Sequence, residues 1–241
     1  MGKRILVSWS GGKDSAWALY LLQQQAEYEV AALLTTVNSH FGRVAMHGFR
    51  QELLEQQAEA AELPLWPVPL PWPCSNEQYE AAMATVCVRA VDEGIKAIAF
   101  GDLFLEDIRA YREAKLAGTG LEPMFPCWQL PTNQLAREMI AAGLRAHLVC
   151  VDPRQLDARF AGRMFDDALL KDLPATVDPC GERGEFHTFV SAGPMFARGG
   201  GSRSIEVRRG DVVERDGFVY ADLLPASSSS HLAHQNSASL R

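Results

Sequence analysis

The first 25 residues constrain the fold of this chain more than any other segment. The apolar run from Lys3 to Ser8 has the length of a buried strand, and a glycine turn at Gly11-Gly12 follows it. Apolar residues then recur at helical spacing, which predicts a helix over residues 14–25. A strand that passes through a glycine turn directly into a helix is the opening unit of an α/β fold.

The same alternation continues along the first half of the chain. We expect further strands at residues 30–36, 65–70 and 96–100, and helices at residues 51–62 and 75–93. Because the apolar segment at 65–70 contains Pro67 and Pro69, we expect it at a sheet edge or in an extended loop. Strands that alternate with helices predict a parallel, doubly wound, Rossmann-like sheet with right-handed crossovers.

The second half has a different pattern, and it predicts a smaller α+β domain. Helices are expected at 107–115, at 133–142 and twice within 155–173. Extended segments are expected at 122–128, 148–151, 185–190, 204–209, 212–215 and 218–221, with a hairpin turn at Asp216-Gly217. Glycines and a proline at 118–123 suggest a boundary, which gives domains at 1–120 and 121–225. The serine-rich residues 226–241 are predicted to be a disordered tail.

Charge and cysteine content exclude several classes of protein. Thirty acidic residues against 23 basic ones give a net charge of −7, which argues against a general nucleic-acid binder but allows a local phosphate pocket. The five cysteines form no C-x-x-C pair, so neither a disulfide framework nor a zinc site is predicted, and a cytoplasmic location is the expectation. No signal peptide, membrane span or transition-metal site is predicted. The sequence leaves the oligomeric state open.

The segment Ser10-Gly11-Gly12-Lys13-Asp14-Ser15 has the composition of a phosphate cradle. It stands at a predicted helix N-terminus, where unpaired backbone N–H groups and the helix dipole favour an anion. Two glycines allow close approach of the backbone, and hydroxyl and ammonium groups add donors. The spacing matches neither a Walker A loop nor a dinucleotide fingerprint. The alternative interpretation is a glycine turn that only starts a helix.

This segment resembles the SGGxDS loop of the N-type ATP pyrophosphatases, which cleave ATP between its α- and β-phosphates. The resemblance implies that Ser10, Gly11, Gly12, Lys13 and Ser15 hold the β- and γ-phosphates. It implies that Asp14 places Mg²⁺ or orders the loop, and that adenine rests against the end of the second strand. Leu34, Thr35 and Thr36 occupy that strand end.

Motifs in the second half narrow the resemblance to the diphthine–ammonia ligase family over residues 3–198. The segments that carry it are Gly101-Asp102, Tyr111-Arg112, Leu121-Glu122-Pro123, Gly143, Cys180-Gly181-Glu182-Arg183-Gly184-Glu185-Phe186-His187-Thr188 and Gly193-Pro194-Met195-Phe196. Arg183 stands where the family usually has glycine, and residues 103–110 are similar to those of bacterial members. The resemblance implies an ATP-binding domain followed by an acceptor domain.

The family reaction would make an amide from a carboxylate and ammonia, with release of AMP and pyrophosphate. Glu182 and Glu185 would then bind ammonium or accept its proton, and His187 would orient one of them. Asp102 would hold the ribose, the metal or the acceptor, and Arg112 would clamp the acceptor carboxylate. From the residues alone, the glutamates could equally be a solvated turn, His187 a core histidine, Asp102 a helix cap and Arg112 part of a charged helix face.

Three functions remain open from the sequence. The first is an ATP-dependent amide ligase whose acceptor is diphthine on elongation factor 2 or an unknown small acid. The second is a tRNA-modifying enzyme with the same loop, against which the acidic net charge and the absence of cysteine pairs argue. The third is a non-catalytic adenine-nucleotide-binding protein.

Overall fold

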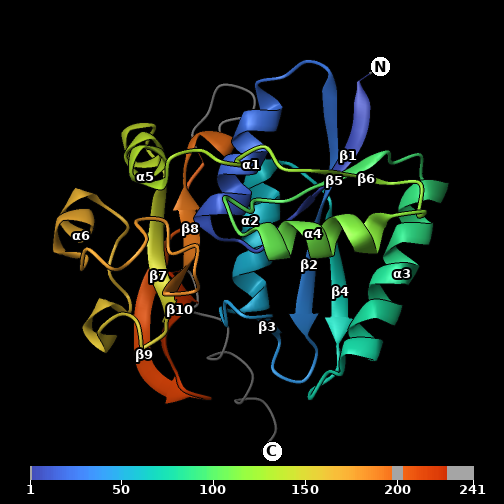
Figure 1. Cartoon of the computed structure of the whole chain (residues 1–241). Coiled ribbons are helices and arrows are strands. Elements are labelled where there is room, and N and C mark those ends of the chain that lie inside the picture. The colour runs from blue at the N-terminus through green and yellow to red at the C-terminus, as the bar shows by residue number, and fades with distance from the viewer. Residues whose placement is uncertain (1, 197–202, 227–241) are drawn as a thin grey trace, which may run out of the picture.

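The computed structural model describes residues 2–196 and 203–226, and they form two sheets (Figure 1). The first half contributes β1 Lys3–Ser8, α1 Lys13–Gln23, β2 Tyr28–Asn38, β3 Arg43–Val44, α2 Gln51–Ala61, β4 Leu65–Leu70, α3 Asn76–Asp92, β5 Ala97–Ala99, α4 Glu106–Leu116 and β6 Glu122–Met124. The second half contributes α5 Thr132–Ala141, β7 Arg145–Val151, α6 Asp167–Asp172, β8 Phe186–Ala192, β9 Val207–Arg215 and β10 Phe218–Pro225, with short 3₁₀ turns at Ala158–Phe160 and Pro194–Phe196.

The first sheet confirms the predicted Rossmann-like fold. Strands β4, β2, β1, β5 and β6 pair in parallel in that order, and only the short β3 runs antiparallel, beside the end of β2. The predicted edge strand is β4, in which Pro67 and Pro69 are exposed while their neighbours are buried. The chain leaves β1 for β2 on one side and returns to β5 on the other, so the strand order reverses between β1 and β5. Open α/β sheets place their ligands at the carboxyl ends of strands at such a point.

Alternating side chains of the strands pack against helices on both faces of this sheet. On β1, Ile5 and Val7 join the core that contains α1 and α2, whereas Leu6 joins the core formed with α3. The helix predicted from Ser75 has the expected capping box, because the Ser75 hydroxyl accepts from the Gln78 amide and the Ser75 backbone N–H donates to the Gln78 side chain. The first half is therefore a layer of strands between two layers of helices.

The second sheet is antiparallel, in the order β8, β7, β10 and β9. The two strands expected at 204–209 and 212–215 form the single strand β9, and the predicted turn at Asp216-Gly217 joins it to β10. One hydrophobic core continues from α1 and α2 into β7 and β8, so the two sheets pack together.

The boundary at 120/121 stays a prediction, although the strand that follows it belongs to the first sheet. Strand β6 pairs with β5 through Ala97 and Glu122, which extends that sheet beyond the predicted boundary. Of the predicted tail, residues 227–241 lie outside the described residues. Among the described helices, none is long and apolar enough to span a membrane.

Candidate active site

A cavity of about 740 Å³ opens at the carboxyl ends of β1, β2 and β5, where the strand order reverses. Its walls come from α3, α4, the segment after β3, and the loop before β8. It brings together most of the residues predicted from sequence: Ser10, Asp14, Ser15, Leu34, Thr35, Thr36, Gly101, Asp102, Arg112, Glu182 and His187. Gly11, Gly12, Lys13 and Glu185 lie beside the cavity without lining it.

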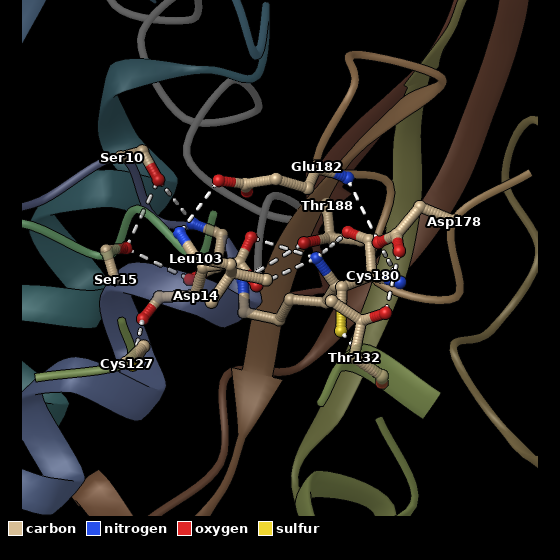
Figure 2. Close-up of polar contacts among 12 residues, drawn as sticks. Ser10, Asp14, Ser15, Leu103, Cys127, Thr132, Asp178, Cys180, Glu182 and Thr188 are labelled. Carbon is tan, nitrogen blue, oxygen red and sulfur yellow. Dashed lines mark hydrogen bonds and ion pairs between the residues drawn. The ribbon is translucent and has the colours of Figure 1, made fainter. Parts of the chain in front are cut away.

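Hydrogen bonds of its own hydroxyl groups stabilise the conformation of the loop after β1 (Figure 2). The Ser10 hydroxyl accepts a hydrogen bond from the Gly12 amide at 3.3 Å and lies 3.2 Å from the Ser15 hydroxyl. Ser15 in turn donates to the carbonyl of Gly12 at 3.0 Å. Both hydroxyls therefore lie at the cavity wall, beside the N-terminus of α1, where they can bind an anion.

Two glycines allow the backbone to pack closely around this loop. Gly11 has a φ of +74°, and a Cβ there would lie 2.7 Å from Oε1 of Gln57. A Cβ on Gly101 would lie 2.7 Å from the backbone nitrogen of Ser15. The end of β5 therefore contacts the first turn of α1 directly, and a larger residue would separate them.

Gln57 holds the loop from behind, and sequence reasoning missed it. Its amide nitrogen donates to the carbonyls of Gly11 at 2.9 Å and Val190 at 2.7 Å, while its oxygen accepts from the Trp9 indole at 3.0 Å. The side chain is fully buried. Its position on the apolar stripe of α2, one turn after Leu53, was the available signal.

The side chain of Lys13, one of the residues that the resemblance assigns to the phosphates, does not line the cavity in this structure. Its side chain is 2% exposed, and its ammonium group lies 2.9 Å from both carboxylate oxygens of Asp14. It also donates to the carbonyl of Cys180. Burial alone would lower the pKa of Lys13, but the surrounding acidic groups, Asp14 foremost, together outweigh burial and raise it. Lys13 is therefore a charged link between the loop and the segment before β8.

Glu182 and Glu185, predicted as a pair, occupy different environments. The Glu182 carboxylate lines the cavity and accepts from the backbone N–H of Leu103 at 2.7 Å. Burial raises the pKa of Glu182 to about 7. Glu185 is 1% exposed and accepts from the backbone N–H groups of Asp178 at 2.8 Å and Arg183 at 2.9 Å. In this structure Glu185 shapes the loop, whereas the Glu182 carboxylate lies at the cavity wall.

Asp178 is a second residue that the sequence analysis missed. Its carboxylate accepts from the Thr132 hydroxyl at 2.7 Å and from the backbone N–H groups of Cys180 at 2.9 Å and Glu182 at 3.3 Å (Figure 2). The signal was the Asp-Pro pair at 178–179, because an aspartate that opens a turn binds nearby backbone amides. Asp178 thereby fixes the loop that carries Glu182.

Two neutral histidines contribute to the cavity wall. The ring of His187, on β8, lies 4.8 Å from that of His47, which follows β3. His47 Nδ1 lies 3.0 Å from the carbonyl oxygen of Thr188. Burial lowers the pKa of His47 to about 3 and that of His187 to about 4. Near neutral pH both rings are therefore uncharged hydrogen-bonding groups.

Asp102 and Arg112 form an ion pair at the wall between β5 and α4. Arg112 reaches the Asp102 carboxylate through two nitrogens, at 2.5 and 3.2 Å, and its guanidinium lies over the Phe100 ring. Asp102 thus orients the arginine that the sequence analysis assigned to the acceptor. This two-point contact fixes the plane of the guanidinium at the cavity.

Comparison with known proteins identifies the family. Residues 3–121 match the family model of the diphthamide synthase N-terminal domain, and residues 131–212 match that of its C-terminal domain. The chain belongs to the diphthamide synthase family. The curated diphthine–ammonia ligases of Bos taurus and Homo sapiens are 24% and 25% identical to it over 217 and 219 residues, which is 81% of each chain.

The relatives' names place this diphthamide synthase family member among ligase-type enzymes. The two matched domains cover the loop after β1 and the Glu182 loop, which meet at the cavity. The two segments that meet at the cavity, the loop after β1 and the loop that carries Glu182, thus come from different matched domains.

The residues at the cavity also fit a magnesium ion brought in with a nucleotide. No group of three metal-ligating side chains occurs in the part of the chain that the structure describes. Mg²⁺ bound with a nucleotide needs only one or two carboxylates, because phosphates and water supply its other ligands. Asp14 is a carboxylate at the cavity wall, so the donor set fits such an ion.

Proposed function

We propose that this chain is an ATP-dependent amide ligase, which adenylates a carboxylate and transfers ammonia to it with release of AMP and pyrophosphate. The observation that carries the proposal is the pairing of two features in one cavity. The anion-binding loop forms one wall, and Glu182, a carboxyl group with its pKa near neutrality, contributes another. Charge stabilisation and proton transfer are the two tasks that this reaction requires.

ATP fits this cavity with its phosphates at the loop and its adenine at the end of β2. The Ser10 and Ser15 hydroxyls and the first turn of α1 would bind the β- and γ-phosphates. Leu34, Thr35 and Thr36 form the wall near the end of β2 and would contact the base. In this arrangement the α-phosphorus would face the rest of the cavity.

The acceptor carboxylate would attack that phosphorus while pyrophosphate leaves. Arg112, held by Asp102, presents a planar guanidinium suited to a carboxylate. Mg²⁺, held by Asp14 with the phosphates, would neutralise charge on the pyrophosphate when bound. The acceptor would be diphthine on elongation factor 2, as the names of the relatives suggest, or an unknown small acid.

Ammonia would then displace AMP from the acyl adenylate. Glu182 accepts a proton from the incoming nitrogen, because its raised pKa makes it a base matched to neutral pH. His187 lies at the same wall as an uncharged ring that can orient a donor without repelling a cation.

Nucleotide product analysis tests this function. The protein is incubated with Mg-ATP, ammonium chloride and either a small-molecule extract of its own cells or purified elongation factor bearing diphthine. We expect AMP and pyrophosphate with one of these acceptors, and neither product without an acceptor. Asp14→Asn should abolish turnover. Formation of ADP and phosphate that is lost in this variant would overturn the proposal.

A further inference from the structure

The ammonium group of Lys13 fills a cage of the kind that binds ammonium ions. Nζ lies 2.9 Å from both carboxylate oxygens of Asp14 and donates to the carbonyl of Cys180. It also lies over two aromatic rings, 5.7 Å from the centre of Phe165 and 5.4 Å from that of Phe186. A carboxylate, a carbonyl and ring faces are the groups that attract a small cation with N–H donors. We call these four groups the Lys13 cage.

The position of the cage is unexpected for the lysine of a phosphate-binding loop. Lys13 is nearly fully buried and points towards the segment before β8, whereas the neighbouring Asp14 lines the cavity. The cage thus shares its carboxylate with the cavity wall. It lies between the two segments that the ligase reaction requires.

We propose that the Lys13 cage is the binding site of the ammonium substrate, which ATP opens by attracting Lys13 to its phosphates. This inference rests on the proposed function. NH₄⁺ offers the same N–H donors and charge as the lysine side chain, so the four groups suit both. A bound triphosphate gives Lys13 a second anionic partner besides Asp14. Lys13 moves from the cage to the phosphates if it binds the phosphates more strongly than the cage.

Ammonium bound in the cage would supply the nitrogen for the amide-forming step. Glu182 lines the same cavity as Asp14 and interacts electrostatically with both Asp14 and Lys13. Bound NH₄⁺ loses one proton to the Glu182 carboxylate, and the freed lone pair attacks the acyl carbon. The C–N bond forms as the bond between that carbon and the oxygen of AMP breaks, and the second proton leaves to solvent. AMP and the amide are the products.

Vacating the cage by mutation tests the inference without any turnover. In Lys13→Ala, ammonium chloride should raise the melting temperature by roughly 2–4 °C over sodium chloride at equal ionic strength, because the ion binds only the folded cage. Wild-type protein, whose cage is filled, should show no difference between the two salts. Potassium chloride has a cation of similar size without N–H donors and should act as sodium chloride does. Arg112→Ala is the matched control, since it removes a cation that is held by the Asp102 carboxylate beside the Phe100 ring.

Equal stabilisation of Lys13→Ala by all three salts, or of both variants by ammonium, would overturn the ammonium assignment. If Lys13→Ala does not fold in sodium buffer, its refolding yield replaces the melting temperature, and a yield no higher in ammonium chloride counts against the cage. These results do not depend on product analysis. If ammonium specifically stabilised Lys13→Ala but the wild-type protein formed ADP from ATP, the proposed function would be refuted and the cage assignment would stand.

Discussion

The backbone amide of Lys13 donates a hydrogen bond to the Thr188 hydroxyl at 3.0 Å, across a sequence separation of 175 residues. Lys13 begins α1, and the first amides of a helix have no partner within the helix. Strand β8 of the second sheet therefore satisfies a donor of the loop after β1. The carbonyl of Gly11 adds a second link, because it accepts from the Val190 amide at 2.9 Å. The loop geometry thus depends on the packing of one sheet against the other.

Replacing Thr188 by valine should weaken this link while preserving side-chain shape. The Lys13 amide would stay buried without its acceptor, which costs roughly 1–3 kcal/mol of unfolding free energy. Urea denaturation measures the loss. Thr85→Val is the control, because Thr85 is exposed on α3 and donates only to the carbonyl of Ala81 within its own helix. Its effect should stay within about 0.5 kcal/mol. Equal losses in both variants would show that Thr188 contributes nothing special.

Gln57→Leu should destabilise the protein more strongly than Thr188→Val. It would leave the Trp9 indole N–H and two carbonyls without their shared partner in a buried site. We expect a loss of roughly 2–4 kcal/mol, measured by urea denaturation, together with weaker ATP binding measured by calorimetry. Gln134→Leu removes an exposed glutamine on α5 and should have little effect. A stable Gln57→Leu protein with unchanged ATP affinity would show that Gln57 does not hold the loop after β1 in place.

The contrast between Ser10 and Gln57 shows what sequence could and could not predict. Ser10 belongs to a contiguous motif between a strand and a helix, so local pattern was enough to place it at the cavity. Gln57 acts through Val190, which lies 133 residues away, and such a contact depends on how the two sheets pack. A local pattern was also not enough to show the position of Glu185, because its spacing from Glu182 suggested that the two carboxylates act as a pair. The turn at Gly184 separates them, so that one carboxylate faces the cavity and the other binds backbone.

Glu182→Gln should change the pH dependence of both stability and activity. The folded protein holds a proton on Glu182 up to about pH 7, whereas the unfolded chain releases it near the ordinary value of 4.5. The unfolded state therefore binds fewer protons between these values, and this group makes stability fall as pH rises from 4.5 to 7. Urea denaturation should show a smaller fall in the glutamine variant, with parallel curves below pH 4.5. Amide formation in the wild type should rise through about pH 7, and the glutamine variant should support none of it. Identical stability profiles would refute the raised pKa.

His187→Asn should change the acid side of the stability profile in the opposite sense. In the unfolded chain this histidine takes up a proton near pH 6.5, but burial in the folded protein delays uptake to about pH 4. The unfolded state therefore binds more protons in this window, and stability is lost as pH falls from 6.5 towards 4. The asparagine variant should lose less unfolding free energy across that window, as measured by urea denaturation at a series of pH values. Above pH 6.5 the curves of variant and wild type should run parallel, because the imidazole is then neutral in both states. A variant that is as acid-sensitive as the wild type would show that His187 is not held neutral by burial.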